Sequence, residues 1–280
     1  MAVVAKEGRA NLERFDLQNG SITPLTRGDQ AVTHVTSNSA NVTSNGTQMV
    51  ARISNALELN ELYAVGDGAP RRLTGVNEKL FAGLNLTPPQ DVWYKSFDGR
   101  NIHALVQLPP DFDARKKYPL ILNIHGGPHA AYGYTFFHEM QWMAARGYVV
   151  LYPNPRGSTS YGEAFANIIQ YKYPGDDYRD LMAGVDELIR RGYVDEKRLG
   201  VTGGSGGGLL TNWAIGQTDR FAAAVSQRDI SDWTAWWYSA DFSLFQPAWF
   251  RKPPFENPQE YRDRSPMTFI NKVKTPTMFI

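Results

Sequence analysis

The sequence contains no cysteine among its 280 residues. This absence excludes disulfides, thiolate metal sites and thiol catalysis, and it fits a reducing compartment, so we expect a cytoplasmic protein. Separately, we expect no cofactor. The net charge of only +1 argues against nucleic acid or an anionic membrane surface as the main partner. Long apolar runs are absent too, and the apolar start of the chain is too short for a signal peptide. We therefore expect neither a membrane nor a nucleic-acid partner.

The most specific motif that is present is Gly203-x-Ser205-x-Gly207. Residues 199–202 before it predict a strand, and residues 209–215 after it predict a helix. A serine in this position is typical of a nucleophile elbow, in which a tight turn projects the hydroxyl out of the backbone. Strand and helix pack too closely there for β-carbons at the two flanking positions, which explains both glycines. The pattern predicts that Ser205 is a nucleophile.

Apolar runs alternate with amphipathic segments through most of the chain. Further strands are predicted over residues 92–97, 102–108, 118–124, 148–152, 221–226 and 274–280, and further helices over 136–145 and 177–191. This alternation predicts an α/β fold with a mostly parallel sheet and helices on both faces. An Asp-Gly turn joins the first two strands and predicts a hairpin.

The first part of the chain has a different pattern of short strands and turns. It contains a weak repeat with a period of 48 residues, which pairs Phe15 with Tyr63, Leu17 with Val65, Gly20 with Gly68, Leu25 with Leu73 and Thr26 with Thr74. This period suits a four-stranded propeller blade. We interpret residues 1–87 as a partial β-propeller-like segment, with a small β extension as the alternative. Two prolines mark the boundary to a second domain over residues 88–280.

A loop of sequence His125-Gly126-Gly127-Pro128 follows the predicted strand that ends at Ile124. Such a loop can lend a backbone N–H to the oxyanion that forms when a serine attacks a carbonyl. The N–H of Gly206, directly after the nucleophile, is the second expected donor. A loop of this kind upstream of a serine elbow is a specific combination and favours acyl transfer.

A catalytic serine also needs a base, and no histidine follows Ser205 in this chain. In this fold the acid and the histidine follow the nucleophile in chain order. The five histidines all come earlier, at positions 34, 103, 125, 129 and 138. We expect that the triad Asp and His are not in this chain, that it is a fragment of a longer enzyme, and that it is inactive or weak by itself. The interrupted last strand also predicts an exposed edge and possible homo-oligomers.

Two groups of side chains are candidates for substrate binding. Arg156 can bind a substrate carbonyl or carboxylate, or it can pair with Asp176 or Asp177 as a structural brace. The irregular stretch over residues 230–269 is rich in aromatic side chains that can cap the site. We expect two or three of its rings to face substrate and the others to pack, and the substrate-facing candidates are Trp233, Trp237 and Tyr238.

These motifs together resemble the prolyl oligopeptidase family of serine peptidases, in particular its acylaminoacyl-peptidase-like branch. The matching segments are residues 125–128, 154–158 with 161–162, 203–207, 263–266 and 274–276. The resemblance implies an α/β-hydrolase fold, incomplete at its C-terminus and preceded by the last blades of a β-propeller. It also implies Ser205 as nucleophile and the N–H groups of Gly127 and Gly206 as oxyanion donors.

The resemblance further implies a short peptide or acyl-peptide as substrate. One departure is Gly206, because many relatives carry Tyr or His there, and we expect a looser site as a result. Two alternatives remain open: a carboxylesterase acting on small esters, and a non-catalytic α/β-hydrolase-like binding module. The repeat in residues 1–87 favours the peptidase over the esterase, and the lack of a histidine after Ser205 favours the binding module.

Overall fold

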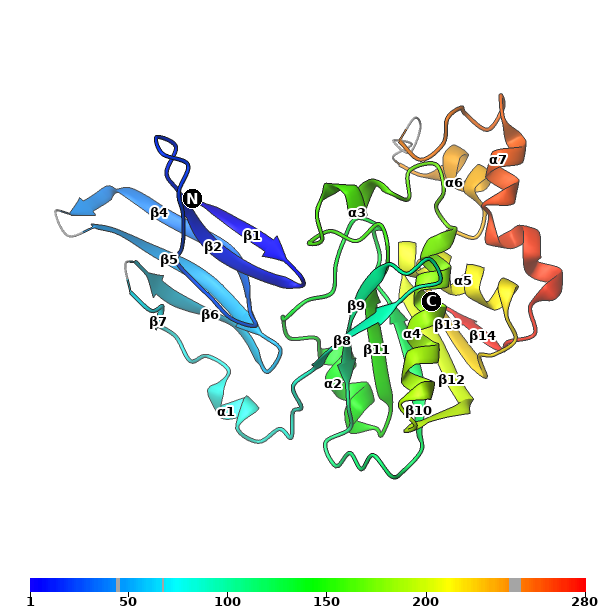
Figure 1. Ribbon diagram of the computed structural model, residues 1–280, viewed down its shortest axis with the longest axis horizontal. Helices are drawn as coiled ribbons and strands as arrows, with labels where there is room; N and C mark the ends of the chain where they lie inside the picture. Colours follow the sequence, from blue (N-terminus) through cyan, green and yellow to red (C-terminus); the bar gives the residue numbers. More distant parts are fainter. Residues whose placement is uncertain (44–45, 67, 242–247) are drawn as a thin grey trace. The chain divides into compact units, whose positions relative to one another are not determined.

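The computed structural model describes residues 1–43, 46–66, 68–241 and 248–280 (Figure 1). Phe242 and Phe245, two rings of the predicted aromatic stretch, lie outside the described residues. The chain falls into two compact units, residues 1–89 with 133–145 and residues 90–132 with 146–280. Each unit is described by itself below.

The first unit is a seven-stranded sheet with two helices. Its elements are β1 (Ala2–Lys6), β2 (Arg9–Phe15), β3 (Ile22–Pro24), β4 (Ala31–Thr43), β5 (Gly46–Asn55), β6 (Glu58–Val65), β7 (Arg71–Arg72), α1 (Glu78–Phe81) and α2 (His138–Ala145). The strand order is β1-β2-β4-β5-β6-β7, with β3 paired to β2. The sheet is antiparallel except at the short parallel pairing of β2 with β4.

The predicted repeat corresponds to two similar three-stranded ribbons, β1-β2-β3 and β5-β6-β7. In each ribbon a threonine after the last strand binds back to the middle strand. Thr26 Oγ1 accepts the N–H of Leu12 at 2.9 Å, and Thr74 Oγ1 accepts the N–H of Leu62 at 2.9 Å. The repeat pairs these same two threonines. The assignment of residues 1–87 to a propeller stays a prediction.

The second unit contains a seven-stranded mixed sheet and most of the helices. Its strands are β8 (Gln90–Lys95), β9 (Asn101–Gln107), β10 (Tyr118–Ile124), β11 (Val149–Asn154), β12 (Val194–Gly204), β13 (Ala223–Gln227) and β14 (Thr277–Phe279). Its helices are α3 (Glu163–Asn167), α4 (Asp176–Arg190), α5 (Gly206–Gln217), α6 (Trp233–Ser239), α7 (Pro258–Asp263) and the 3₁₀-helix η1 (Pro266–Lys272).

The strand order of this sheet is β14-β13-β12-β10-β11-β9-β8 (Figure 1). Strands β10 to β14 run parallel to one another, whereas β9 is antiparallel to both of its neighbours. The predicted hairpin is β8-β9, and the predicted mostly parallel sheet is confirmed. Because the parallel strands end at one edge, the loops after β10, β11, β12 and β13 meet there.

Apolar strand residues and one stripe of α4 form the core of this unit. Leu181, Val185 and Leu188 of that stripe are buried against strand residues such as Leu122 and Val201. Each buried aliphatic side chain of this kind contributes roughly 1.5–3 kcal/mol relative to exposure. The same helix also buries two carboxylates near its N-terminus, which the apolar stripe did not predict.

In the described part of the stretch predicted to be irregular, residues 230–241 and 248–269, there are two short helices and the start of η1. Helix α6 begins after Asp232, whose side chain accepts the N–H groups of Thr234 and Ala235. An aspartate at this position is a usual N-terminal cap. The sequence did carry a signal for this helix, because Trp233, Trp236 and Trp237 follow Asp232 at a helical spacing. Among the described residues, no helix has the length and apolar character needed to cross a bilayer.

Candidate active site

Ser205 lies between β12 and α5, at the carboxyl edge of the second unit's sheet. Its backbone has φ 58° and ψ −119°, a sparsely populated conformation that costs a non-glycine residue about 1–3 kcal/mol. Its N–H donates to the carbonyl of Gln227 at 3.0 Å, and its carbonyl accepts the N–H of Leu209 at 2.9 Å. These bonds hold the strained turn while the residue stays exposed. The predicted tight turn is confirmed.

The glycines on either side of Ser205 have no room for a side chain. A Cβ on Gly203 would lie 2.5 Å from the carbonyl oxygen of Gly207, and a Cβ on Gly207 would lie 2.0 Å from that of Ile124. Both separations are shorter than any real Cβ contact. The predicted reason for the two glycines, close packing of strand and helix, is therefore confirmed.

The loop after β10, residues 125–132, lies against this turn. A Cβ on Gly126 would lie 3.3 Å from the Cβ of Ser205. Gly127 has φ 122°, which favours glycine. Its carbonyl oxygen is 2.9 Å from the place that a Cβ of Gly206 would occupy. The two expected oxyanion donors thus belong to adjoining backbone segments, and their roles as donors stay predictions.

Gly206 opens α5, so the free N–H groups of the first helical turn lie beside Ser205. Such a helix start attracts negative charge. A Cβ on Gly206 would lie 2.8 Å from the hydroxyl of Tyr173, which donates to the Gly206 carbonyl at 3.0 Å. Tyr173 therefore fills the space beside Gly206, and the expected loosening of the site stays a prediction.

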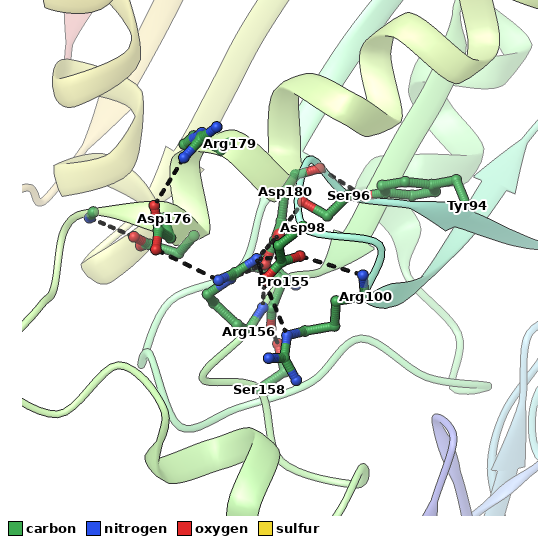
Figure 2. Close-up of polar contacts among 12 residues, drawn as sticks. Tyr94, Ser96, Asp98, Arg100, Pro155, Arg156, Ser158, Asp176, Arg179 and Asp180 are labelled. Atoms are coloured by element: carbon green, nitrogen blue, oxygen red, sulfur yellow. Dashed lines mark hydrogen bonds and ion pairs between the residues drawn. The ribbon is translucent and has the colours of Figure 1, made fainter.

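Arg156 follows β11 and is 5% exposed. Its Nε and Nη2 donate to the two carboxylate oxygens of Asp180 at 2.8 Å each, and its backbone N–H donates to Asp180 Oδ2 at 2.8 Å. Asp98 lies 3.2 Å from Nη2, and Asp176 lies 3.6 Å from Nη1. Figure 2 shows the guanidinium among these three carboxylates.

This arrangement favours the structural brace over the substrate-binding role of Arg156. Of the two partners that the sequence suggested, Asp176 is confirmed. Asp177 is wrong as a partner of Arg156, because its Oδ1 instead accepts the N–H of Gly175 at 2.5 Å. The strongest partner, Asp180, was missed.

Asp177 is buried at the start of α4, and within the described residues its Oδ2 has no hydrogen-bond partner. Burial, together with the charge of Asp180, raises the pKa of Asp177 to about 7, and backbone N–H groups oppose the shift. A carboxyl group in such a site is half protonated near neutral pH.

The histidines beside the elbow are bound to other groups. His125 is half-buried, with Nδ1 2.7 Å from the carbonyl oxygen of Gly126 and Nε2 3.0 Å from Ser158 Oγ, and the loss of solvent around the ring lowers its pKa. His129 Nδ1 lies 3.0 Å from the carbonyl oxygen of Gly157. In the part of the chain that the structure describes, no imidazole forms a hydrogen bond with the Ser205 hydroxyl.

The three aromatic candidates differ in exposure. Trp233 is 3% exposed and packs edge-on against Phe250 at 5.3 Å, so its burial favours a packing role over contact with substrate. Trp237 is half-buried and lies 6.1 Å from the ring of Tyr261. Tyr238 is 65% exposed. Substrate contacts of Trp237 and Tyr238 stay predictions.

Comparison with known proteins identifies the family. Residues 134–280 match the model of the prolyl oligopeptidase family. The chain belongs to this family. An uncharacterized peptidase of Bacillus subtilis, YuxL, is 42% identical over 246 residues, which are 87% of this chain and 37% of that protein.

Solved structures agree with this assignment to the prolyl oligopeptidase family. An acylaminoacyl peptidase of Pyrococcus horikoshii matches with a TM-score of 0.88 and 32% identity, over 98% of this chain and 42% of that one. An acylaminoacyl peptidase in complex with Z-Gly-Gly-Phe-chloromethyl ketone matches with a TM-score of 0.86 and 32% identity, over 98% of this chain and 43% of that one. The predicted α/β-hydrolase fold is confirmed. The chain spans about two fifths of the length of these relatives.

Proposed function

We propose that this chain carries the nucleophile and oxyanion donors of a serine peptidase that hydrolyses short peptides or acyl-peptides. The observation that carries the proposal is the strained backbone of Ser205, with φ 58° and ψ −119°, at the start of α5. A strained backbone at an exposed serine persists only where surrounding contacts hold it in place, and such strain is concentrated at active sites. Membership of a peptidase family supports the same reaction.

In the proposed reaction, Ser205 Oγ attacks the carbonyl carbon of the substrate and the hydroxyl proton passes to a base. The carbonyl oxygen becomes an oxyanion, to which the N–H groups of Gly127 and Gly206 donate. The C–N bond then breaks, the amine leaves with the proton, and an acyl-enzyme remains on Ser205 until water hydrolyses it. Each oxyanion donor supplies about 3 kcal/mol of transition-state stabilisation.

The proposed reaction also needs a base and an orienting acid, and the chain holds no histidine after Ser205. By itself, the chain is then expected to turn over little or no substrate. A peptide substrate agrees with the peptide-derived chloromethyl ketone bound by one structural relative. Self-association and a cytoplasmic location rest on the sequence alone and stay predictions.

The test is hydrolysis by this chain joined to the remaining C-terminal residues of the Bacillus subtilis relative. Peptide, N-acyl-peptide and simple ester substrates are compared at equal concentration. We expect cleavage of the peptides or acyl-peptides that is lost in Ser205→Ala and kept in Ser239→Ala, which removes another exposed serine. Hydrolysis of esters alone would overturn the peptidase in favour of the esterase, and activity that survives Ser205→Ala would overturn the nucleophile.

A further inference from the structure

Three side chains of the second unit form a continuous series of hydrogen bonds that the proposed reaction does not use. Asp91 on β8 lies 2.6 Å from His103 Nε2 through its Oδ1. On the other side of the ring, His103 Nδ1 lies 2.5 Å from the hydroxyl of Tyr161, in the segment after β11. The His103 side chain is fully buried, and its ring stacks on Trp93 at 4.8 Å. The imidazole is therefore fixed on three sides.

Asn154 connects this series to the loop beside Ser205. Its Nδ2 donates to the Tyr161 hydroxyl at 2.8 Å and to the carbonyl of Tyr132 at 3.0 Å, and its Oδ1 accepts the N–H of Tyr132 at 2.7 Å. Asn154 is completely buried. A side-chain amide that binds both backbone groups of one residue fixes that residue as strand pairing would. Tyr132 closes the loop that begins at His125 and includes Gly127.

The donors and acceptors match along the whole series when His103 is neutral. A carboxylate only accepts, so the His103 nitrogen that faces Asp91 carries the proton. The other nitrogen then accepts from the Tyr161 hydroxyl, which in turn accepts from the Asn154 amide. Each group thus orients the next one, from Asp91 on β8 to the backbone of Tyr132.

We propose that Asp91, His103 and Tyr161 are positioning residues for the oxyanion loop, acting through Asn154. They touch no substrate. They fix the Asn154 amide, which holds Tyr132 and with it the segment that presents the N–H of Gly127. This inference rests on the proposed function only in treating the Gly127 N–H as an oxyanion donor. The coupling between Tyr161 and the loop is a property of the folded chain.

The test is hydrogen exchange of backbone amides in residues 125–132, measured by mass spectrometry on this chain. Tyr161→Phe removes the hydroxyl that accepts from Asn154 and donates to His103. We expect exchange in this loop to become about fivefold faster, the change that corresponds to one lost hydrogen bond. The matched control is Tyr94→Phe, which removes another buried hydroxyl, one that donates to the Asp180 carbonyl. The control is expected to leave exchange in residues 125–132 unchanged.

Equal exchange of the loop in both variants would overturn the proposal. Nitrogen-15 spectra of His103 in the unmodified chain provide a second measurement that does not depend on a variant. At neutral pH we expect a protonated Nε2 and an unprotonated Nδ1, and a ring protonated at Nδ1 would overturn the proposed order of donors. Neither readout requires turnover, so a serine that fails to react would count against the proposed function alone.

Discussion

Two clusters at the carboxyl edge of the second unit's sheet are built in opposite ways. Around Ser205 the contacts come from the backbone: glycines on both sides, a strained φ, and an exposed side chain. Around Arg156 the contacts come from charged side chains: the buried guanidinium is matched by the buried carboxylate of Asp180 and by the more exposed carboxylates of Asp98 and Asp176 (Figure 2). One cluster leaves the Ser205 side chain, the proposed nucleophile, exposed, and the other leaves the charge of Arg156 no room for a ligand.

The difference shows how a reactive site is distinguished from a brace when both carry suggestive residues. An arginine near an active site invites assignment to substrate, but one that binds Asp180 through two nitrogens has its donors already occupied. A serine in a strained, exposed turn has no comparable structural purpose. The burial of a side chain and the number of its hydrogen-bond donors already bound therefore indicate its role better than its residue type does.

The largest expected effect is loss of the brace. Arg156→Leu leaves the fully buried Asp180 without its main partner, and we expect the free energy of unfolding to fall by about 3–5 kcal/mol. Urea denaturation measures the change. Arg190→Leu is the control, because Arg190 binds Glu187 at the surface, and exposed pairs contribute about 0.2–1 kcal/mol. A loss below about 1 kcal/mol for Arg156→Leu would remove the contrast between the two clusters.

The next effect concerns pH. The pKa of Asp177 is raised from its usual value of 3.8 to about 7 by burial, so the folded protein holds this proton more tightly than the unfolded chain does. The proton on Asp177 stabilises the folded state fully below pH 4. This stabilisation decreases as the pH rises to about 7, and the total loss is at most about 4 kcal/mol. Asp177→Asn should flatten the dependence of stability on pH in this range. An unchanged slope in denaturation curves would contradict the assignment.

Relief of strain at the elbow is a smaller effect of opposite sign. Ser205→Gly places a residue without a Cβ at φ 58°, and we expect stability to rise by about 1–2 kcal/mol while the proposed nucleophile is lost. Ala235→Gly within α6 is the control, because Ala235 is exposed and a glycine inside a helix should cost about 0.5–1 kcal/mol. Destabilisation by Ser205→Gly would mean that the turn is not strained, and the elbow would then resemble an ordinary loop.

The smallest effect is expected at the exposed ring of Tyr238. Tyr238→Ala should change the free energy of unfolding by less than about 0.5 kcal/mol, because the side chain packs little, whereas Trp233→Ala should cost about 3–5 kcal/mol. If Tyr238 contacts substrate, the same variant raises KM in the completed enzyme. Equal decreases in Tm for both variants would contradict the assignment of Trp233 to the core and of Tyr238 to the surface.

The sequence predicted what local patterns specify. Apolar runs located the central strands, and Gly203-x-Ser205-x-Gly207 located the elbow, because strand, turn and helix follow one another along the chain. The stripe of α4 predicted Leu181 and its neighbours as core residues, with observed bounds within one residue of those expected.

What the sequence did not predict are the partners brought together by folding. In the sequence, Asp180 lies next to the apolar stripe of α4 and has the pattern of an exposed helix charge. Only the fold brings Arg156, which follows β11, beside it. Asp91 and His103 are twelve residues apart, but nothing in either strand indicates that Tyr161 completes their hydrogen bonds. The sequence likewise did not predict that Tyr173 lies beside Gly206, because its hydroxyl belongs to a loop 33 residues earlier in the chain.

The most direct test of the account is labelling by a fluorophosphonate probe, with the labelled residue identified by mass spectrometry. The probe is applied to this chain alone and to the chain completed with the C-terminal residues of the Bacillus subtilis relative. The account predicts rapid labelling of Ser205 in the completed protein and slow labelling in the chain alone, where no imidazole of the described residues is hydrogen-bonded to Ser205. Absence of labelling at Ser205 in the completed protein would contradict the central claim that this strained serine is a nucleophile.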